Sequence, residues 1–429
     1  MKERFYRLIN WKYWPELFFF CFFVINFLVT FANYFLKIYF NDTKILTFFY
    51  YGLIALLGLL SIRFFLKKIT IADFVAFAVW SFLILISYFF LPSVSKDAPI
   101  DFFCTNYPFC FIWFVFAKCL IELENDFKKW AKITTFFVCT ISLFYCIFLF
   151  FVTDSVRQMT LGYESCAFTM LAMYFLSCDK SGKKWIWWFS IAAGITATVL
   201  FGSRGPFLIC GFYFVYVLFF RIIKSLKKKV IILVIICVCL LVLIINNNLF
   251  KLFYLLGSTL ENYGVSGRII DILKNPESLF SSSDRDLLAQ IIIDGTASRP
   301  FTPFGLFGDR SLTYFFDSSS AYGVYSHNII LEIFVAFGVP LGAIVLTVFC
   351  TLIIFTYKRI MFDLDKKAMF VLFFVIGFIA LFFSGSFITH LYFYGLWGCV
   401  SFIWSKKKST NYGAVNKKDG VLRITEINL

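Results

Sequence analysis

The stretch Tyr325-Ser-His-Asn-Ile-Ile-Leu-Glu332 joins the two kinds of sequence that make up this chain. Before it lies the interval 251–326, which is long, mixed in charge and rich in Gly, Ser, Asp and Arg. After it an apolar helix is expected to begin, and most of the remaining chain is equally apolar. We therefore expect any chemistry to occur where this polar interval meets a membrane surface.

The composition is typical of a membrane protein. Of the 429 residues, 61% are hydrophobic and 63 are Phe, and the mean hydropathy is +0.84. A soluble domain could not bury that much apolar surface, so the composition predicts an all-α polytopic membrane protein. The 13 Cys occur singly in apolar runs, with none in 251–326. We interpret them as packing residues rather than as a disulfide framework.

Twelve apolar runs are long enough to cross a bilayer, which takes about 20 helical residues. No ionisable residue lies at the centre of any run, and this weakens a transporter hypothesis, because ion-coupled transporters usually carry such groups. The runs fall near residues 17–38, 45–66, 71–91, 101–121, 131–152, 162–178, 185–202, 206–223, 229–250, 328–356, 368–387 and 390–404.

The connections between these runs alternate in charge. One set, which includes both termini, is rich in Lys and Arg, and the other is poor in Lys. The positive-inside rule places the first set in the cytoplasm and the second outside. Orientation thus explains the net charge of +15, since 251–326 holds six basic and eight acidic residues, and nucleic acid is not expected as a partner. The predicted parts are nine membrane helices in 1–250, a large outer loop with short helices in 251–327, three helices in 328–405 and a cytoplasmic tail in 406–429.

Three arginines on the outer side are candidate phosphate ligands. Arg204 stands in the short hairpin 202–206 between two apolar runs, where it could bind an anion or simply extend to the membrane surface. Arg268 and Arg285 each follow a Ser by two residues, and that Ser can cap a short helix. The spacing puts each Arg in a first helical turn, where free amides favour anions. Ordinary surface arginines are the alternative interpretation.

His327 is one of two histidines in the chain, and it stands where the outer loop becomes a membrane helix. A general base for an amphiphilic substrate would need this position, although a lone interfacial His can also be a simple hydrogen-bonding residue. Glu332 follows five residues later and is offset around the helix, so we expect it to orient its neighbours. His390 has no supporting context and is interpreted as structural. No cluster in the sequence has the spacing of a metal site.

Taken in order, these segments resemble the O-antigen polymerase and O-antigen ligase superfamily, the Wzy/WaaL-type membrane glycosyltransferases. The most specific element is His327-Asn-Ile-Ile-Leu-Glu332 running into Phe337-Gly-Val-Pro-Leu-Gly342. It follows the hairpin Ser203-Arg-Gly205, the two Arg-bearing segments and the turn Phe304-Gly-Leu-Phe-Gly-Asp-Arg310.

A weaker element lies upstream. Arg157-Gln-Met-Thr-Leu-Gly162 is similar to an arginine–glycine element of the family, but Tyr163-Glu-Ser165 stands where Asn-Pro-Asn often follows. The resemblance covers about 150–345 by motif and the whole chain by topology.

The resemblance implies a GT-C-like inverting transferase that works outside the cytoplasmic membrane of a bacterium, without a metal or nucleotide cofactor. Its donor would be a glycan on undecaprenyl diphosphate. The arginines matching Arg204 and Arg285 would bind the diphosphate, and the residue matching His327 would serve the acceptor hydroxyl. The further candidate substrate-binding residues are Arg268, Arg310, Arg157, Asn328, Glu332 and Tyr325.

The leading function is polymerisation of lipid-linked repeat units into O-antigen, capsule or exopolysaccharide. Ligation of the glycan to a lipid A core or another acceptor is the alternative, because both reactions use the same donor. A polysaccharide-lipid flippase would also have about twelve spans, but it should show polar groups along a central cavity and no large outer loop. Besides the lipid-linked donor and acceptor, a chain-length regulator and a flippase are candidate partners.

Overall fold

The structure, a computed structural model, describes residues 13–30, 32–33, 44–92, 95–122, 125–152, 159–179, 182–201, 204–231, 233–234, 251, 254–255, 257–259, 274, 284–314, 324–383 and 385–406. These residues form helices joined by turns, and none of them lies in a strand. The prediction of an all-helical protein is confirmed for this part of the chain.

The main helices follow the chain in a simple order. The first half contains α2 (Trp14–Phe20) with its π-helical continuation η2 (Cys21–Ile25), α4 (Lys44–Leu60), α5 (Ile62–Lys68), α6 (Ile71–Phe90), α7 (Ala98–Thr105), α8 (Tyr107–Glu122), α9 (Asn125–Val152), α10 (Met159–Cys178) and α11 (Lys184–Leu200). The second half contains α12 (Arg204–Val217) with η4 (Leu218–Ile222), α16 (Asp284–Ser298), α17 (Gly308–Thr313), α18 (Ile329–Phe337), α19 (Val339–Arg359), α20 (Leu364–Gly377), the 3-10 turn η6 (Ile379–Phe382) and α21 (Leu391–Ser405).

Several of these helices suit a membrane. Four described segments are long and apolar enough to cross it alone, namely Ile71–Phe89, Asp126–Leu149, Gly205–Ile222 and Val339–Arg359. Two bent pairs raise the number to six if each pair is one span. These helices agree with the prediction of a polytopic membrane protein. One of the twelve predicted runs, 229–250, lies mostly outside the described residues.

The predicted span 328–356 is wrong as a single helix. It divides at Gly338, whose φ of 75° ends α18, and Pro340 lies in the first turn of α19. The Val339 amide instead donates to the carbonyl oxygen of Pro300 at 2.8 Å. Hydropathy could not reveal this break, because the residues around it are as apolar as the helices they separate.

Two more predicted spans are bent. The run 45–66 turns by 62° at Ser61, between α4 and α5, and the run 101–121 turns by 47° at Asn106, between α7 and α8. Pro108 stands in the first turn of α8, where its missing amide proton is tolerated but would interrupt a continuous helix. The bend brings the Asn106 side chain to the surface of a cavity described below.

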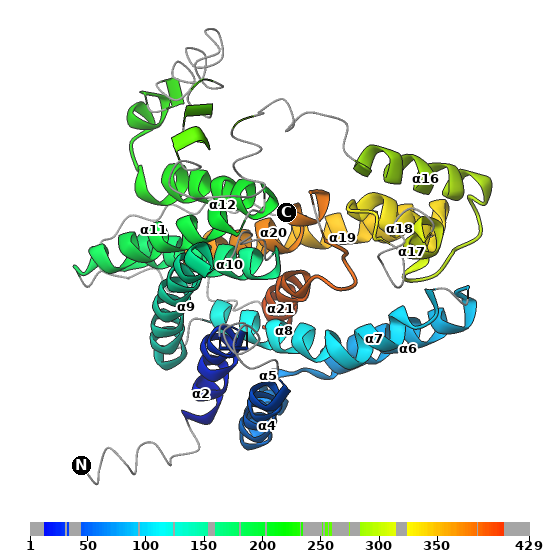
Figure 1. Cartoon of the computed structure of the whole chain (residues 1–429), viewed down its shortest axis with the longest axis horizontal. Helices are drawn as coiled ribbons and strands as arrows, with labels where there is room; N and C mark the ends of the chain where they lie inside the picture. The colour runs from blue at the N-terminus through cyan, green and yellow to red at the C-terminus, as the bar shows by residue number, and fades with distance from the viewer. Residues whose placement is uncertain are drawn as a thin grey trace, which may run out of the picture.

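Helix α21 lies between α8 and α20 (Figure 1). Contact is close because Gly398 of α21 faces the backbone of α8, where a Cβ atom would stand 2.2 Å from the carbonyl oxygen of Phe114. Small residues allow membrane helices to approach in this way. Aromatic rings fill the surrounding core: Trp113 is 2% exposed, and its ring centroid lies 4.6 Å from that of Tyr392.

A buried ion pair joins three of these helices. Lys118 on α8 binds the carboxylate of Asp73 on α6, and Ser401 on α21 hydrogen-bonds to both side chains. An unpaired charge inside an apolar bundle would be costly, so the three side chains satisfy one another. This cluster fixes α6 against the α8–α21 pair.

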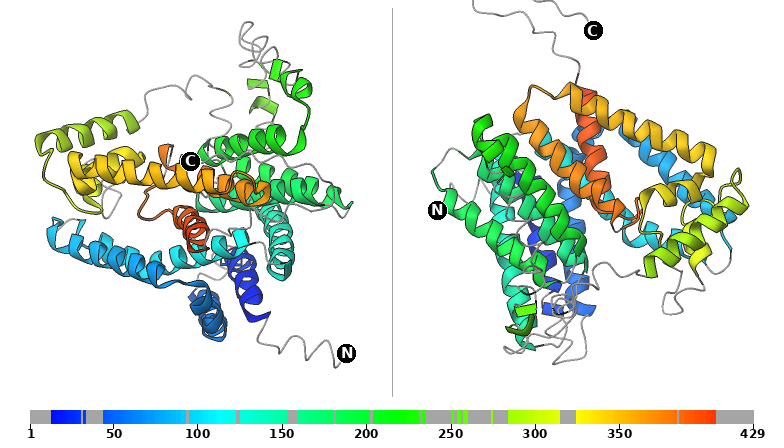
Figure 2. Two further views of the ribbon diagram at one scale, coloured as in Figure 1. Left: turned by 180° about the vertical axis from the view of Figure 1, so that it is seen from behind. Right: turned by 90° about the horizontal axis from the view of Figure 1, so that it is seen from above.

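The short helices gather at one end of the molecule. Helices α16, α17 and α18 lie side by side there when the molecule is seen from the front, from behind and from above (Figure 1, Figure 2). Because α19 and α21 start at this end and continue into the bundle, the membrane helices carry the short helices at their tips.

Gly398→Ala should lower the stability of the protein, because the new methyl group would collide with the α8 backbone. Overpacking of this kind typically costs about 1–3 kcal/mol. Thermal unfolding of the purified protein in detergent measures the effect. Gly211→Ala on α12 is the matched control, since nothing lies within 4 Å of its new Cβ atom. Equal melting temperatures for the two variants would contradict the close α8–α21 contact.

Candidate active site

The turn 304–310 leads to α17 and is fixed by its backbone and by burial. Gly305 and Phe307 have positive φ values of 85° and 68°. The Phe307 ring is buried and packs against Phe102 of α7, with centroids 5.8 Å apart. The Leu306 amide donates to the hydroxyl of Ser87 on α6 at 3.0 Å. The turn therefore docks on α6 and α7, and its last residues, from Gly308 on, begin α17.

Asp309 ties α17 to the segment that enters α18. Its buried carboxylate accepts from the Ser326 amide at 2.8 Å and from the Arg310 amide at 2.9 Å. The Thr313 hydroxyl exchanges hydrogen bonds with the backbone of Val324. Burial raises the pKa of Asp309, and the charge of Arg310 and the donated amides partly oppose this rise. Together these contacts hold 324–327 against α17.

His327 has an unusual backbone conformation. Its φ of 53° lies in the left-handed region, which non-glycine residues rarely adopt. The residue before it is held by Asp309, and Asn328 after it caps α18 by accepting from the Ile330 amide at 2.9 Å. The His327 ring contacts Tyr325, with centroids 4.1 Å apart. Strained positions of this kind persist only where the surroundings determine them, and they concentrate at functional sites.

Glu332 completes the framework from α18. Its buried carboxylate accepts from the Ser386 hydroxyl and from the Phe387 amide, the latter at 2.9 Å. Burial raises the pKa of Glu332 well above its ordinary range, and the nearby charge of Asp309 adds to the rise. The contact positions segment 385–390, which leads into α21. Glu332 therefore orients its neighbours, as its offset on the helix predicts.

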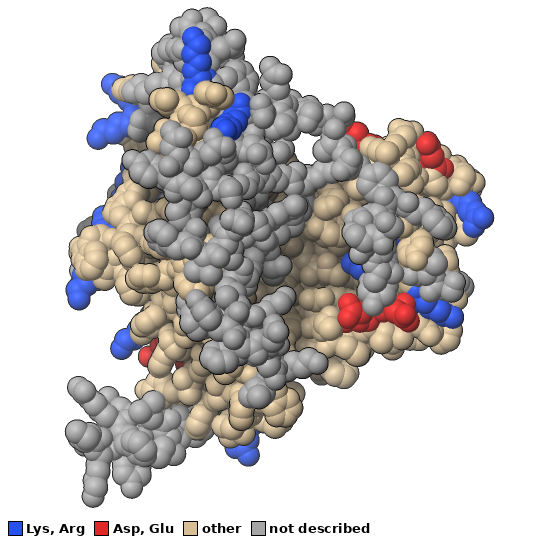
Figure 3. All heavy atoms as spheres, in the orientation of Figure 1, with Lys and Arg blue, Asp and Glu red and all other residues tan. Residues whose placement is uncertain are grey.

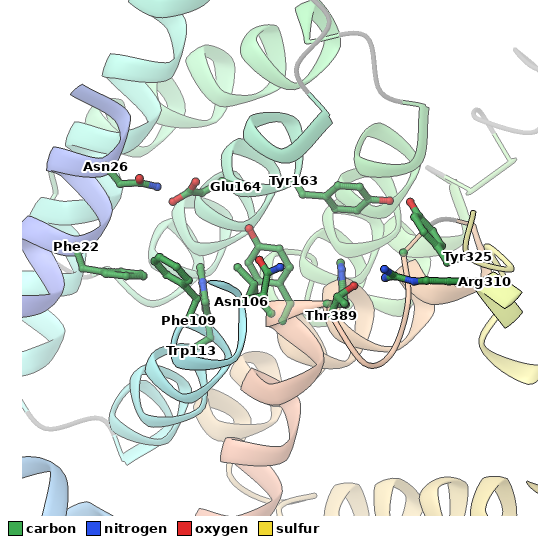
Figure 4. Close-up of a pocket in the computed structure, with 14 residues that line it drawn as sticks. Phe22, Asn26, Asn106, Phe109, Trp113, Tyr163, Glu164, Arg310, Tyr325 and Thr389 are labelled. Atoms are coloured by element: carbon green, nitrogen blue, oxygen red, sulfur yellow. The ribbon is translucent and has the colours of Figure 1, made fainter. Parts of the chain in front are cut away.

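A cavity of about 430 Å³ lies between this framework and the N-terminal helices. This volume is in the range of small-molecule sites. Figure 4 shows Arg310, Tyr325 and Thr389 on one side of the cavity, whereas Asn26 and Glu164 face each other on the other side. The Arg310 guanidinium lies 5.0 Å from the centroid of the Phe307 ring, which fixes it over an aromatic face.

The structure brings some predicted site residues together. Arg310 and Tyr325 line the cavity, and the His327 ring contacts that of Tyr325. Asn328 and Glu332 make the framework contacts described above. Of the predicted site residues that the structure describes, these five therefore belong to one region.

The other predicted site residues are four arginines, and the structure describes only the backbone of two of them. Arg204 is the first residue of α12, and Arg285 is the second residue of α16, which places it in a first helical turn as predicted. The side chains of both lie outside the described part of the structure, as do Arg157 and Arg268 entirely.

The cavity also contains polar residues that sequence reasoning missed. Asn26, Asn106 and Glu164 line it. Asn26 and Asn106 stand in apolar runs without a motif, and Glu164 stands in Tyr163-Glu-Ser165, where the sequence departs from the upstream family element. The sequence signal that could have identified them is the presence of a polar residue inside an apolar run, which often marks a functional position in a membrane protein. The interpretation of His390 as purely structural is incomplete: its ring lines the cavity, while its Nε2 lies 2.8 Å from the carbonyl oxygen of Ile376.

Within the described ranges, no group of three or more His, Cys, Asp or Glu side chains is arranged to hold a metal ion. The positive charge that the described residues bring to this cavity comes from Arg310.

Replacing Glu332 with Ala should destabilise the protein and disturb the cavity wall. The Ser386 hydroxyl and the Phe387 amide would lose their acceptor in a buried place, and each such loss typically costs about 1–3 kcal/mol. Glu332→Gln keeps one acceptor oxygen and should fall between Ala and the wild type. Thermal unfolding in detergent measures all three, and a wild-type melting temperature for Glu332→Ala would contradict the bridging role.

The same variants give a pH dependence of defined sign. Because the folded-state pKa of Glu332 is raised above the ordinary 4.5, the carboxyl ionises more readily in the unfolded chain as the pH rises. The wild type should therefore lose stability relative to Glu332→Gln above pH 4.5, whereas below this pH the difference should level off. A difference that stays constant above pH 4.5 would contradict the raised pKa.

Comparison with known proteins gives one finding. Residues 189–346 match the family model described as O-Antigen ligase (Wzy_C). The matched part runs from α11 into α19 and contains Arg204, Arg285, Arg310 and His327. Neither a curated protein nor a solved structure matches the chain. The family match agrees with the resemblance that the motifs between about 150 and 345 carry. Residues 189–346 of this chain are therefore similar to the O-antigen ligase family.

Proposed function

We propose that the protein is a surface-polysaccharide polymerase that joins repeat units carried on undecaprenyl diphosphate. The reaction would be an inverting, metal-independent glycosyl transfer of the GT-C type on the outer face of the cytoplasmic membrane. One observation carries this proposal: within the part of the chain that matches the O-Antigen ligase model, Arg310 and Tyr325 line one cavity and His327 contacts Tyr325.

The chemistry follows from the residue types. The acceptor hydroxyl oxygen bonds to C1 of the donor sugar, while the bond from C1 to the diphosphate oxygen breaks and its electrons leave with the diphosphate. Guanidinium groups stabilise the charge that develops on this leaving group through paired hydrogen bonds. Arg310 lines the cavity, and Arg204 and Arg285 open helices in the family-matched part, so these three are the proposed diphosphate ligands.

His327 is the proposed general base. It takes the proton of the acceptor hydroxyl as the new bond forms, which an imidazole near neutral pH can do. The strained φ of 53° supports this role, because Asp309 and Asn328 hold the residue in a conformation it would not adopt by itself.

The proposed topology has twelve spans, with both termini in the cytoplasm and 251–327 outside as one loop domain. Helices α19 and α21 start beside the site and end at Arg359 and Ser405. The Arg359 side chain donates to the carbonyl oxygen of Lys406, directly after α21, at 2.8 Å. Lys68 and Lys406 both pair with Glu122 there. Figure 3 shows most of the visible acidic side chains at the end that carries α16 and mainly Lys and Arg at the opposite end. The positive-inside rule makes that opposite end cytoplasmic.

A ligase is the second candidate function, because the matching family model is described as O-Antigen ligase. The donor and the proposed residue roles would be the same, and only the acceptor would differ. Incubation of the purified protein with lipid-linked repeat units separates the two: a ladder of longer glycans indicates a polymerase, whereas transfer only to an added second acceptor indicates a ligase.

Arg204→Ala and Arg285→Ala should each abolish product formation at normal protein level, because the leaving group would lose charge stabilisation. Arg→Lys should restore little activity, since Lys cannot form the paired hydrogen bonds. Gel analysis of products from purified protein measures this. Gln290→Ala, an exposed position on the same helix as Arg285, should retain activity. Full activity of Arg285→Ala would remove this residue from the site.

His327→Ala should lower turnover by about 10²–10⁴-fold, the usual contribution of a general base. Donor binding should persist, because a base assists the chemical step rather than the binding of the diphosphate. The measurement is turnover together with donor affinity, compared with Arg285→Ala. Loss of donor affinity as severe as in the Arg variant would make His327 a phosphate ligand, and normal turnover would exclude it from the site.

A further inference from the structure

The side of the cavity facing away from Arg310 carries its own polar group. Glu164, near the start of α10, receives a hydrogen bond from the Asn26 side chain, and Asn106 lines the cavity between this pair and Arg310 (Figure 4). These side chains come from three separate parts of the chain. Polar residues in apolar membrane helices are costly and are typically retained for a function.

The walls around this group are aromatic and rigid. Phe22, Phe109 and Trp113 line the cavity, and Trp113 is fixed by ring contacts with Phe23 and Tyr392 at 4.9 and 4.6 Å. Apolar walls with a few placed hydrogen-bonding groups are typical of small-molecule sites. A sugar ring suits such walls, because its C–H groups can lie on aromatic faces while its hydroxyls reach polar side chains.

The charges of the cavity favour one orientation of a substrate. A guanidinium attracts a diphosphate, whereas a carboxyl group offers it no positive charge. Arg310 and Glu164 lie on different sides of the cavity (Figure 4). A molecule with a diphosphate and a neutral sugar would therefore place the diphosphate at Arg310 and extend the sugar toward Glu164. The reverse orientation would place the diphosphate beside a buried carboxyl, without the guanidinium that neutralises its charge.

We propose that Asn26, Asn106 and Glu164 form a subsite for the sugar that is joined directly to the lipid diphosphate, with Glu164 as the residue that selects this sugar by its hydroxyls. The Glu164 carboxyl accepts hydrogen bonds from sugar hydroxyls, Asn26 orients the carboxyl, and Asn106 offers both a donor and an acceptor. This inference rests on the proposed function and adds the place and the chemistry of sugar selection. No motif marks Asn26 or Asn106, and Glu164 stands where this chain departs from the Asn-Pro-Asn of the upstream element, so the subsite is a property of this chain's own fold.

Equilibrium binding in detergent tests the subsite without requiring turnover. The two probes are undecaprenyl diphosphate and the same lipid diphosphate carrying its first sugar. The wild type should bind the sugar-bearing probe more tightly. Glu164→Gln should keep its affinity for the bare lipid diphosphate and lose about 10–100-fold for the sugar-bearing probe, the usual effect of losing a hydrogen bond to a charged group. Arg310→Ala should weaken binding of both probes.

Two outcomes would overturn the subsite. Glu164→Gln could bind the sugar-bearing probe as well as the wild type does, or it could lose affinity for both probes equally. Asp97→Asn, an exposed acidic position without a side-chain cap, is the matched control and should bind both probes normally. A melting temperature for each variant separates misfolding from lost recognition, and Asn106→Ala provides a second test of the same pattern.

A series of deoxy sugars sharpens the test. If Glu164 binds a particular hydroxyl, the wild type and Glu164→Gln should bind the donor lacking that hydroxyl equally well, because the interaction is already absent. A uniform loss across every deoxy donor would instead indicate a structural role. If the wild type forms no glycan product but the sugar-dependent binding holds, the proposed function fails and the subsite stands.

Discussion

Two buried carboxyls, Asp309 and Glu332, hold the candidate site together. A buried carboxyl is tolerated only when hydrogen bonds replace the water it has lost. Asp309 obtains them from the amides of Ser326 and Arg310, and Glu332 from segment 385–390. Because these donors come from different parts of the chain, satisfying each carboxyl also joins α17, α18 and the approach to α21. A buried carboxyl is costly in an apolar protein because it needs hydrogen-bond donors. For the same reason it fixes the segments that supply those donors in one arrangement.

Interrupted helices are the second structural device. An uninterrupted apolar helix uses all of its backbone amides and carbonyls internally and offers none to a substrate within the membrane. A break exposes such groups, provided that other parts of the protein hydrogen-bond to the amides and carbonyls left unpaired. At Gly338 the Val339 amide bonds to Pro300, and the Val335 carbonyl oxygen accepts from the Phe304 amide at 3.0 Å. Those bonds attach the turn 304–310 to the end of α18 and so place Arg310. The break at Asn106 similarly presents a side-chain amide to the cavity.

The two sides of the resulting cavity carry different chemical groups. Arg310 lies over an aromatic ring on one side, and Glu164 pairs with Asn26 on the other. Under the proposed function, a substrate with an anionic part and a neutral polar part would be oriented by these groups, and orientation is among the largest contributions a binding site can make to catalysis. The aromatic walls add apolar contact around the few polar groups.

The sequence by itself determined the membrane character and the helical class, because both depend on local patterns of apolar residues and charge. The short motif that begins at His327 also carried the resemblance to the O-antigen ligase family. The sequence also placed Arg310, Tyr325 and His327 in one region, since they are close in the chain. The tertiary structure decided where helices break and which distant residues meet. Asn26, Asn106, Glu164 and His390 share a cavity only because helices separated by hundreds of residues pack together. The hydropathy of an apolar run depends only on that run and does not indicate which other helix it packs against. These contacts therefore could not be predicted from hydropathy.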